Sequence, residues 1–410
     1  MSPNYHQVTT FIVRSCLSFF ELGSFKTYGV LIQELTKRAD LSFTQLGLIL
    51  AMQRVLSYLL APLGYLLYNI IGPRAAIVFG GLLVGLGYVG NGILPWNALW
   101  LTLCCSLIGI GFGSAWTSSI VILRNAFSDD ATFGIIQTLT DQSSFIGMMI
   151  LPVLFERLQE LYGTRGALLL FGALNLHIIV ASITLRPERG QQVLQEDRHN
   201  SDAALSKVMP LISVHWKVFV SNLSVPFLMI IACLFTFNLV GWALFAVTLG
   251  IEKGLSKSQA VFLSSFAGVG AIFGRLWCIL LYYLKITTPF HFICIPALLE
   301  CITFIILMLP DDNYVMLLTV SFVVGITFGL IGAAMGGLCS MKVPVEDFNP
   351  AVVLFFISVA MGNATGGGLS GAAYDIFGST QIVFLEMAIA SFLVFLLAFC
   401  WSIIEYIKND

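Results

Sequence analysis

Long apolar runs follow one another along almost the whole chain, and they constrain the fold more than any other feature of the sequence. A helix that crosses a bilayer needs about 20 mostly apolar residues. The runs of this kind cover residues 8–35, 44–70, 74–94, 98–127, 132–158, 165–186, 223–250, 258–283, 288–309, 314–341, 347–375 and 379–406. Short segments with turn residues separate them, such as Gly72-Pro73-Arg74 and Pro310–Asn313. The sequence therefore predicts an all-α membrane protein with about twelve transmembrane helices.

Composition supports this prediction and excludes several classes of protein. Of the 410 residues, 58% are hydrophobic and 10% are charged, whereas a soluble domain carries roughly 25% charged residues. Most apolar side chains must therefore face the lipid bilayer. The net charge of −2 gives no basic field for nucleic acid. The nine cysteines show no CxxC spacing, so we interpret them as small buried hydrophobes and expect neither a metal site nor a cofactor.

One long polar stretch interrupts the apolar runs. It extends from Pro187 to about Asn222 and divides the predicted spans into six and six. We therefore predict an N-terminal six-helix bundle over residues 1–186, a cytoplasmic connecting loop over 187–222 and a C-terminal six-helix bundle over 223–410.

The distribution of basic residues predicts the orientation. If both termini are cytoplasmic, the inner side carries Arg74, Arg124, Arg186, Arg189, Arg198, Lys207, Lys217, Lys285, Lys342 and Lys408. The outer side then carries Lys37, Arg38, Arg157, Arg165, Lys253 and Lys257. This excess of inner Lys and Arg favours cytoplasmic termini under the positive-inside rule.

Two six-span halves around a polar loop are typical of the major facilitator fold, in which the substrate lies near the midplane between the halves. Local motifs add a more specific resemblance. Six segments, in this order along the chain, resemble the monocarboxylate transporter family: Phe25–Val30, Asn69–Arg74, Tyr162–Gly166, Leu185–Pro187, Gly268–Arg275 and Asp375–Gly378. The resemblance implies a secondary transporter of a small monocarboxylate in the plasma membrane. It also implies a single-span glycoprotein companion, which some members of that family need.

The chain departs from the family pattern at three places. The entry motif of the first span is missing from Met1–Thr10, and Asp129-Asp130-Ala131 replaces a basic run. Ala271 stands where proton-coupled members carry an aspartate four residues before the arginine of the eighth span. The sequence is thus similar to a divergent or orphan member, and its proton symport is open to question.

Charged residues inside the predicted spans are the candidate site residues, because a charge at the bilayer centre costs about 2.5–3.5 kcal/mol on insertion scales. Lys26 and Arg275 come from different halves, and together they predict a site for a small organic anion or zwitterion. Tyr28 and Phe266 are aromatic residues expected to contact the apolar body of the substrate, as are Phe25, Trp116 and Trp242.

The remaining intramembrane charges support two alternatives. Asp141 or Glu21 can replace the missing aspartate as a proton acceptor, and Asp141 can instead form a structural pair with Arg54. Glu300 and Glu386 are interpreted as structural or protonated carboxyls.

Two functions from different classes remain. The first is alternating-access transport of a carboxylated metabolite, either by symport or by facilitated diffusion. The second is a transporter-like sensor or scaffold that moves no substrate. No catalytic motif such as HExxH and no nucleotide-binding GxxxxGK[ST] pattern is present, so we do not expect an enzyme or an ATP-driven pump.

Overall fold

The computed structural model describes residues 5–127, 130–185, 219, 224–283, 291–310, 313–342 and 348–409. These residues form helices and connecting turns, with no strand among them. The helices are α1 (Tyr5–Ala39), α2 (Phe43–Leu59), α3 (Ala61–Ile71), α4 (Pro73–Ile93), α5 (Ala98–Ala126), α6 (Asp130–Asn175), α7 (His177–Ile183), α11 (Ser224–Glu252), α12 (Lys257–Tyr283), α13 (His291–Met308), α14 (Tyr314–Lys342), α15 (Phe348–Phe377) and α16 (Thr380–Asn409). The all-α prediction is confirmed.

Ten helical stretches of the described chain are long and apolar enough to cross a membrane. The second predicted span does not count among them because it is broken into α2 and α3 at Leu60. Pro62 lies in the first turn of α3 and has no backbone N–H to donate, which disfavours one continuous helix through Leu60. Together α2 and α3 still cover the predicted run from 44 to 70.

One long helical stretch, 132–183, contains two crossings. Gly163 interrupts α6 with φ of 70°, a backbone conformation that glycine adopts without strain. Before Gly163, Gly147 packs against Gly23 of α1. After Gly163, Asn175 accepts a hydrogen bond from Ser24, the next residue of α1. The chain therefore returns to the same level of α1 after the turn at Gly163. The two parts of α6 therefore run antiparallel, and the described chain makes about twelve crossings, as predicted.

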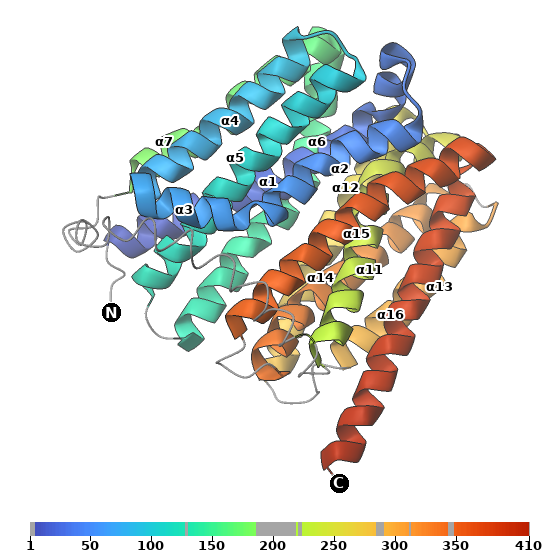
Figure 1. Ribbon diagram of the computed structural model, residues 1–410. Coiled ribbons are helices and arrows are strands. Elements are labelled where there is room, and N and C mark those ends of the chain that lie inside the picture. The colour runs from blue at the N-terminus through green and yellow to red at the C-terminus, as the bar shows by residue number, and fades with distance from the viewer. Residues whose placement is uncertain are drawn as a thin grey trace.

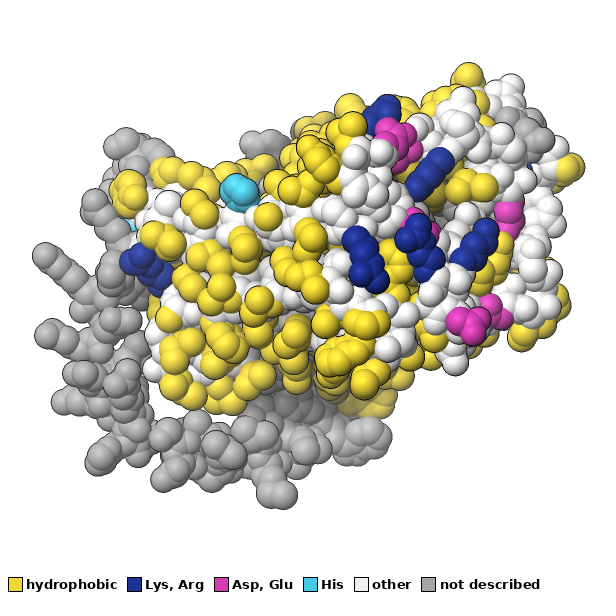
Figure 2. All heavy atoms as spheres, turned by 90° about the horizontal axis from the view of Figure 1, so that it is seen from above, with side chains coloured by type: hydrophobic (Ala, Val, Ile, Leu, Met, Phe, Trp, Pro, Cys, Tyr) yellow, Lys and Arg dark blue, Asp and Glu magenta, His cyan; other side chains and the backbone are white. Residues whose placement is uncertain are grey.

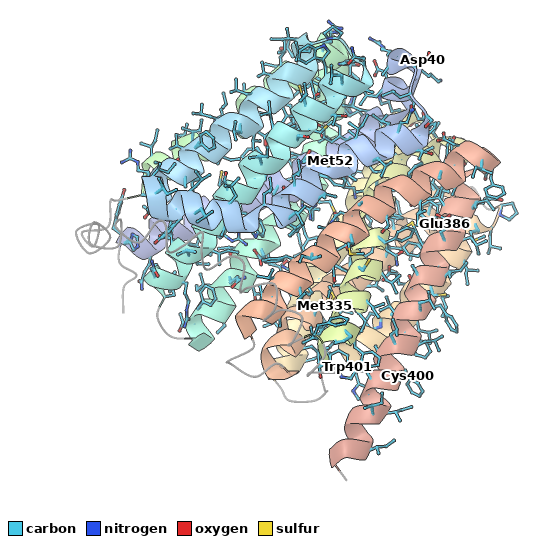
Figure 3. All side chains as sticks on the ribbon, in the orientation of Figure 1. Asp40, Met52, Met335, Glu386, Cys400 and Trp401 are labelled. Carbon is cyan, nitrogen blue, oxygen red and sulfur yellow. The ribbon has the colours of Figure 1, made fainter. Side chains whose placement is uncertain are left out.

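The helices form two groups that lie side by side, α1–α7 and α11–α16 (Figure 1). Across the interface between these halves, α1 packs on α11, α2 on α15 and α6 on α12. Apart from Phe219, the predicted connector 187–222 lies outside the described residues. Both termini lie away from Asp40, which marks the turn between α1 and α2 (Figures 1 and 3). We call these opposite ends of the molecule the Asp40 end and the terminal end.

The surface has the pattern expected in a bilayer. In Figure 2, apolar side chains cover much of the described surface in view, and most charged side chains gather toward the Asp40 end. Leu86, Leu99 and Ile135 are among the large apolar side chains that are more than half exposed. Such a surface is stable only against lipid or another apolar partner.

Glycines set how closely the halves approach. A Cβ on Gly47 of α2 would lie 2.1 Å from the carbonyl oxygen of Gly367 of α15, and a Cβ on Gly371 would lie 2.5 Å from that of Phe43. A Cβ on Gly29 of α1 would lie 2.1 Å from the carbonyl oxygen of Ala243 of α11. Small residues allow such backbone contact between membrane helices. Contacts of this kind close the interface toward the Asp40 end.

Candidate functional site

Three of the charged side chains on α1 are buried: Arg14, Glu21 and Lys26. At a rise of 1.5 Å per residue, Arg14 and Lys26 are separated by about 18 Å along the helix axis. They therefore occupy different depths of the interface, with Lys26 nearer the Asp40 end.

Glu21 and Arg54 form a buried ion pair between α1 and α2. Arg54 also donates a hydrogen bond to the hydroxyl of Tyr58 at 2.9 Å. Its guanidinium lies 5.2 Å from the Tyr58 ring centre and 5.8 Å from that of Phe25. The pair compensates its own charge inside the N-terminal half.

Arg14 and Asp141 form a second ion pair, between α1 and α6, with 2.8 Å between Nη2 and Oδ1. Arg14 also donates to the Ser119 hydroxyl at 3.2 Å, and its guanidinium stacks 3.5 Å above the Trp116 ring. The predicted Arg54–Asp141 pair is therefore wrong. Each carboxylate faces a different arginine, because α1 lies between α2 and α6 and contributes a charged residue toward each.

Arg275 lies on α12, with its guanidinium 4.9 Å from the ring centre of Phe145 on α6. Asp141, the carboxylate that acts electrostatically on Arg275, is already paired with Arg14. The Nε of Arg275 is buried without a hydrogen-bond partner. Ala271, one turn earlier, is fully buried and offers no charge. Arg275 thus brings a cation from the C-terminal half to the Arg14–Asp141 pair.

Lys26 also crosses the interface. Its Nζ donates a hydrogen bond to the carbonyl oxygen of Ser264 on α12 and lies 5.9 Å from the ring centre of Trp242 on α11. Ser264 and Arg275 are eleven residues apart, which is about 16 Å along the axis of α12. Lys26 and Arg275 therefore both lie between the halves but at different depths. In this conformation they do not converge on one small ligand.

The two aromatic residues predicted for the substrate site contact other polar or aromatic side chains in this conformation. The Tyr28 hydroxyl accepts a hydrogen bond from Asn91 of α4, and its ring stacks on Tyr88 at 5.9 Å. Phe266 stacks on Phe262, which is 46% exposed, at 5.8 Å. Tyr28 thus belongs to the packing of α1 on α4, and Phe266 to an aromatic group shared by α12 and α14 that also includes Phe322. Aromatic character alone did not determine which face of each helix they occupy.

The structure also brings in residues that the sequence analysis did not single out. Phe145 lies four residues after Asp141, so both point from the same face of α6 toward α12. This spacing was a usable signal for Phe145. Tyr58, four residues after Arg54, carried the same signal. Ser119 and Ser264 gave none, because each contributes only through a partner on a distant part of the sequence.

Glu300 is buried in the C-terminal half. Its Oε1 accepts a hydrogen bond from Asn238 at 2.9 Å, and the same amide donates to Ser391 at 2.8 Å. These contacts join α13, α11 and α16 and lie apart from the charges between the halves. In the described residues, no group of three His, Cys, Asp or Glu side chains has a geometry suited to a metal ion.

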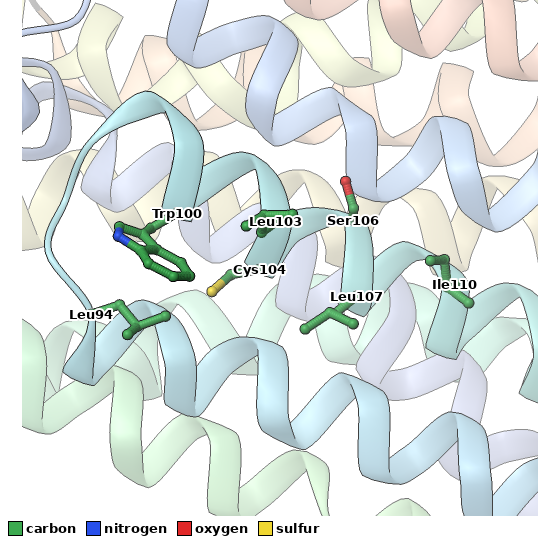
Figure 4. A pocket seen from close by; sticks show the side chains of 7 residues that line it. All are labelled: Leu94, Trp100, Leu103, Cys104, Ser106, Leu107 and Ile110. Atoms are coloured by element: carbon green, nitrogen blue, oxygen red, sulfur yellow. The ribbon is translucent and has the colours of Figure 1, made fainter.

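A cavity of about 310 Å³ lies on the outer side of α5 (Figure 4). Its lining is almost entirely apolar and includes the exposed side chains of Trp100, Leu103 and Leu107. None of the interface charges reaches it. Its position and lining suit an acyl chain of the bilayer better than a polar solute.

Comparison with known proteins agrees with this architecture. The profile of the Major Facilitator Superfamily matches residues 15–346. Two solved structures of transporters of the POT family, one in complex with 5-aminolevulinic acid and one with a thioalcohol-conjugated peptide, superpose with TM-scores of 0.73 and 0.76. They share 14% and 13% sequence identity with this chain and cover 97% and 98% of it, and the matches cover 95% and 96% of those chains. At this identity the likeness concerns the fold.

Similar sequences carry more specific names. Monocarboxylate transporter 12 of Mus musculus is 29% identical over 47% of this chain, and monocarboxylate transporter 13 of Rattus norvegicus is 29% identical over 40%. These two matches span only 36% and 38% of the length of those relatives. Monocarboxylate transporter 4 of Gallus gallus is 23% identical over 88% of this chain and 75% of its own length. The chain is thus a multi-pass membrane protein that belongs to the Major Facilitator Superfamily, with relatives among its monocarboxylate transporters.

Proposed function

We propose that this protein is a secondary transporter that moves a small organic anion, most simply a monocarboxylate, by alternating access. One observation carries the proposal: the positively charged side chains at and near the interface outnumber the carboxylates there. Among the described residues, the cations Arg14, Lys26, Arg54 and Arg275 face only two anions, Glu21 and Asp141. Each acid is already paired with an arginine of the N-terminal half, which leaves a surplus of two positive charges.

The two surplus cations are Lys26 and Arg275, and neither forms an ion pair with a described carboxylate. Positive charge in an apolar interior is costly unless an anion compensates it. A substrate carboxylate supplies that compensation, and the planar guanidinium of Arg275 can bind it with two parallel hydrogen bonds. Phe145, beneath the guanidinium, is available to the apolar part of the substrate.

The depth of the two cations suggests an order of events. Arg275 is only partly buried and lies toward the terminal end, whereas Lys26 is buried nearer the Asp40 end. In this conformation the substrate therefore binds Arg275 first. Lys26 serves a later stage, when the halves have rocked and its contact with Ser264 is released.

The same geometry favours facilitated diffusion over proton symport. Glu21 is held by Arg54 and Asp141 by Arg14, so neither predicted proton acceptor stands free between the halves. Ala271 adds no acid beside Arg275. The carboxylate of the substrate is then itself the counter-ion that Arg275 gains and loses in each cycle. The names of the relatives support a monocarboxylate substrate; the plasma-membrane location and the glycoprotein companion follow from the same resemblance.

Uptake of a panel of radiolabelled monocarboxylates into proteoliposomes tests the proposal. We expect Arg275→Ala to reduce uptake about tenfold or more, since loss of a buried charged partner typically costs 2–5 kcal/mol. Arg275→Lys should also be impaired, because an ammonium cannot reproduce the guanidinium fork. Arg157→Ala is the matched control: Arg157 is an exposed arginine paired with Glu160 at the Asp40 end.

The outcomes separate the alternatives. Parent-like uptake by both Arg275 variants would show that Arg275 does not bind the substrate. Absence of uptake by the parent protein for the whole panel would favour the sensor or scaffold. With the membrane potential clamped, an imposed proton gradient should not drive accumulation. Gradient-driven accumulation that disappears in Asp141→Asn, while equilibration of the substrate without a gradient persists, would instead identify Asp141 as a proton acceptor.

A further inference from the structure

The second span of each half begins with the same structural turn. The two segments are Asp40-Leu41-Ser42-Phe43-Thr44-Gln45 and Gly254-Leu255-Ser256-Lys257-Ser258-Gln259. Their first residues have positive φ, 52° at Asp40 and 80° at Gly254. In each, the serine hydroxyl accepts a hydrogen bond from the backbone N–H of the glutamine three residues later, at 3.2 and 3.3 Å. The two turns are therefore equivalent elements of two repeated halves.

In the N-terminal half, the start of α2 is bound by a carboxylate from the opposite half. Asp375, near the end of α15, accepts hydrogen bonds from the backbone N–H of Phe43 at 2.8 Å and of Thr44 at 2.7 Å. The Thr44 hydroxyl donates to the same carboxylate. A carboxylate at a helix N-terminus binds unpaired N–H groups and interacts favourably with the helix dipole.

In the C-terminal half, the start of α12 also contacts a carboxylate from the opposite half, here through a side-chain hydroxyl. The Ser258 hydroxyl donates a hydrogen bond to Glu156 of α6 at 2.7 Å. Beside it, the Lys257 ammonium donates to Gln159 at 2.7 Å. Ser258 occupies the position in its turn that Thr44 occupies in the other. Two equivalent hydroxyls thus each donate to a carboxylate from the opposite half.

We propose that these contacts, Thr44–Asp375 and Ser258–Glu156, are paired latches that hold the Asp40 end closed and must open together when access alternates. The proposal rests on the transport function proposed above. Both latches lie beyond Lys26, at the end where α2 and α15 are in backbone contact. Because each latch bridges the two halves, separation of the halves breaks both.

Similar contacts within each half show what is specific to the latches. Glu34 accepts a hydrogen bond from Thr164 inside the N-terminal half, and Glu252 accepts one from Thr380 inside the C-terminal half. These contacts also join a carboxylate to the start of a helix at the Asp40 end. They do not cross the interface, so they persist when the halves move as rigid bodies. Thr164→Val therefore provides a matched control for loss of a hydroxyl–carboxylate contact.

Distance measurement between two spin labels tests the latches directly. In a cysteine-free background, Lys37→Cys on α1 and Gln381→Cys on α16 place one label on each half at the Asp40 end, both at exposed positions. In substrate-free protein in nanodiscs, Thr44→Val combined with Ser258→Ala should increase the ratio of long to short distances. The expected increase is roughly two- to tenfold for each hydrogen bond lost. Asp375→Ala should shift the ratio in the same direction, and Thr164→Val should leave it at the parental value.

An unchanged distance distribution in both latch variants would overturn the proposal, as would an equal shift in Thr164→Val. If Asp375→Ala is recovered poorly, Ser258→Ala alone removes a single hydroxyl and is expected to show a smaller shift of the same sign. The label distances need no substrate. A shift without any uptake would therefore support the latches and refute the transport function, whereas Arg275-dependent uptake without a shift would do the reverse.

Discussion

The buried cations of this protein differ in how their charge is compensated. Arg14 is completely buried, yet its charge is balanced by Asp141, its Nη1 donates to Ser119 and its plane lies on Trp116. Lys26 is equally buried and has only a backbone carbonyl and an aromatic ring. Arg14 is thus compensated by a structural ion pair, whereas Lys26 is the cation that we propose as a partner for an anionic ligand.

The Arg14–Asp141 pair yields a prediction about stability. Asp141→Asn removes the partner of a buried cation and should lower the free energy of unfolding by about 3–5 kcal/mol. Arg14→Gln combined with Asp141→Asn removes both charges and should be considerably more stable than the single variant. Thermal unfolding in detergent, followed by tryptophan fluorescence, measures both. Equal losses in the single and double variants would show that the pair contributes little as a unit.

At the scale of helices, contact between α2 and α15 depends on the absence of side chains. Gly47 packs against the backbone of Gly367, and Gly371 against that of Phe43. The latch at Asp375 lies at the end of this contact. Close backbone packing and the latch therefore stabilise the same closed arrangement.

Two glycine-to-alanine variants test this packing, because their effects on stability should have opposite signs. Glycine to alanine within a helix usually stabilises by up to about 1 kcal/mol. Gly134→Ala should follow this rule, since a Cβ there has no neighbour within 4 Å. Gly47→Ala should instead destabilise the closed arrangement, because its Cβ would lie 2.1 Å from the Gly367 carbonyl oxygen. The label pair at Lys37 and Gln381 should report longer distances in Gly47→Ala only, and equal behaviour of the two variants would contradict this account.

At the scale of the whole molecule, the polar contacts inside each half lie in different places from those between the halves. Ion pairs and hydrogen bonds inside the N-terminal half link α1 to α2, α5 and α6. Those inside the C-terminal half link α11 to α13 and α16. The hydrogen bonds that cross the interface among the described residues, by contrast, lie toward the Asp40 end. A rocking motion that opens this end preserves the internal contacts of both halves.

Orientation in the membrane is a prediction at this scale. The distribution of Lys and Arg predicts cytoplasmic termini and an outward-facing Asp40 end. Single cysteines at Lys37 and Asp197, in a cysteine-free background, should then react with a membrane-impermeant maleimide from opposite sides of intact cells. Lys37→Cys should react from outside, and Asp197→Cys only after permeabilisation. Reaction of both from the same side would show that the topology is wrong.

The sequence by itself determined the number and limits of the membrane-crossing segments. The predicted run 74–94 became α4 (Pro73–Ile93), and the run 98–127 became α5 (Ala98–Ala126). The presence of charged residues within these segments was equally evident from the sequence. These features are local: about 20 consecutive apolar residues suffice to define a span, whatever lies next to it.

The tertiary structure decided which of these residues meet. Arg14 and Asp141 are 127 positions apart, and Thr44 and Asp375 are 331 apart. Hydropathy does not determine how each helix is rotated about its axis, so the sequence alone predicted Arg54 as the partner of Asp141, whereas Arg14 is its partner in the structure. Rotation is set by backbone contact at glycines and by the cost of leaving a buried charge unpaired. Both depend on neighbouring helices, and those neighbours are known only once the two halves are assembled.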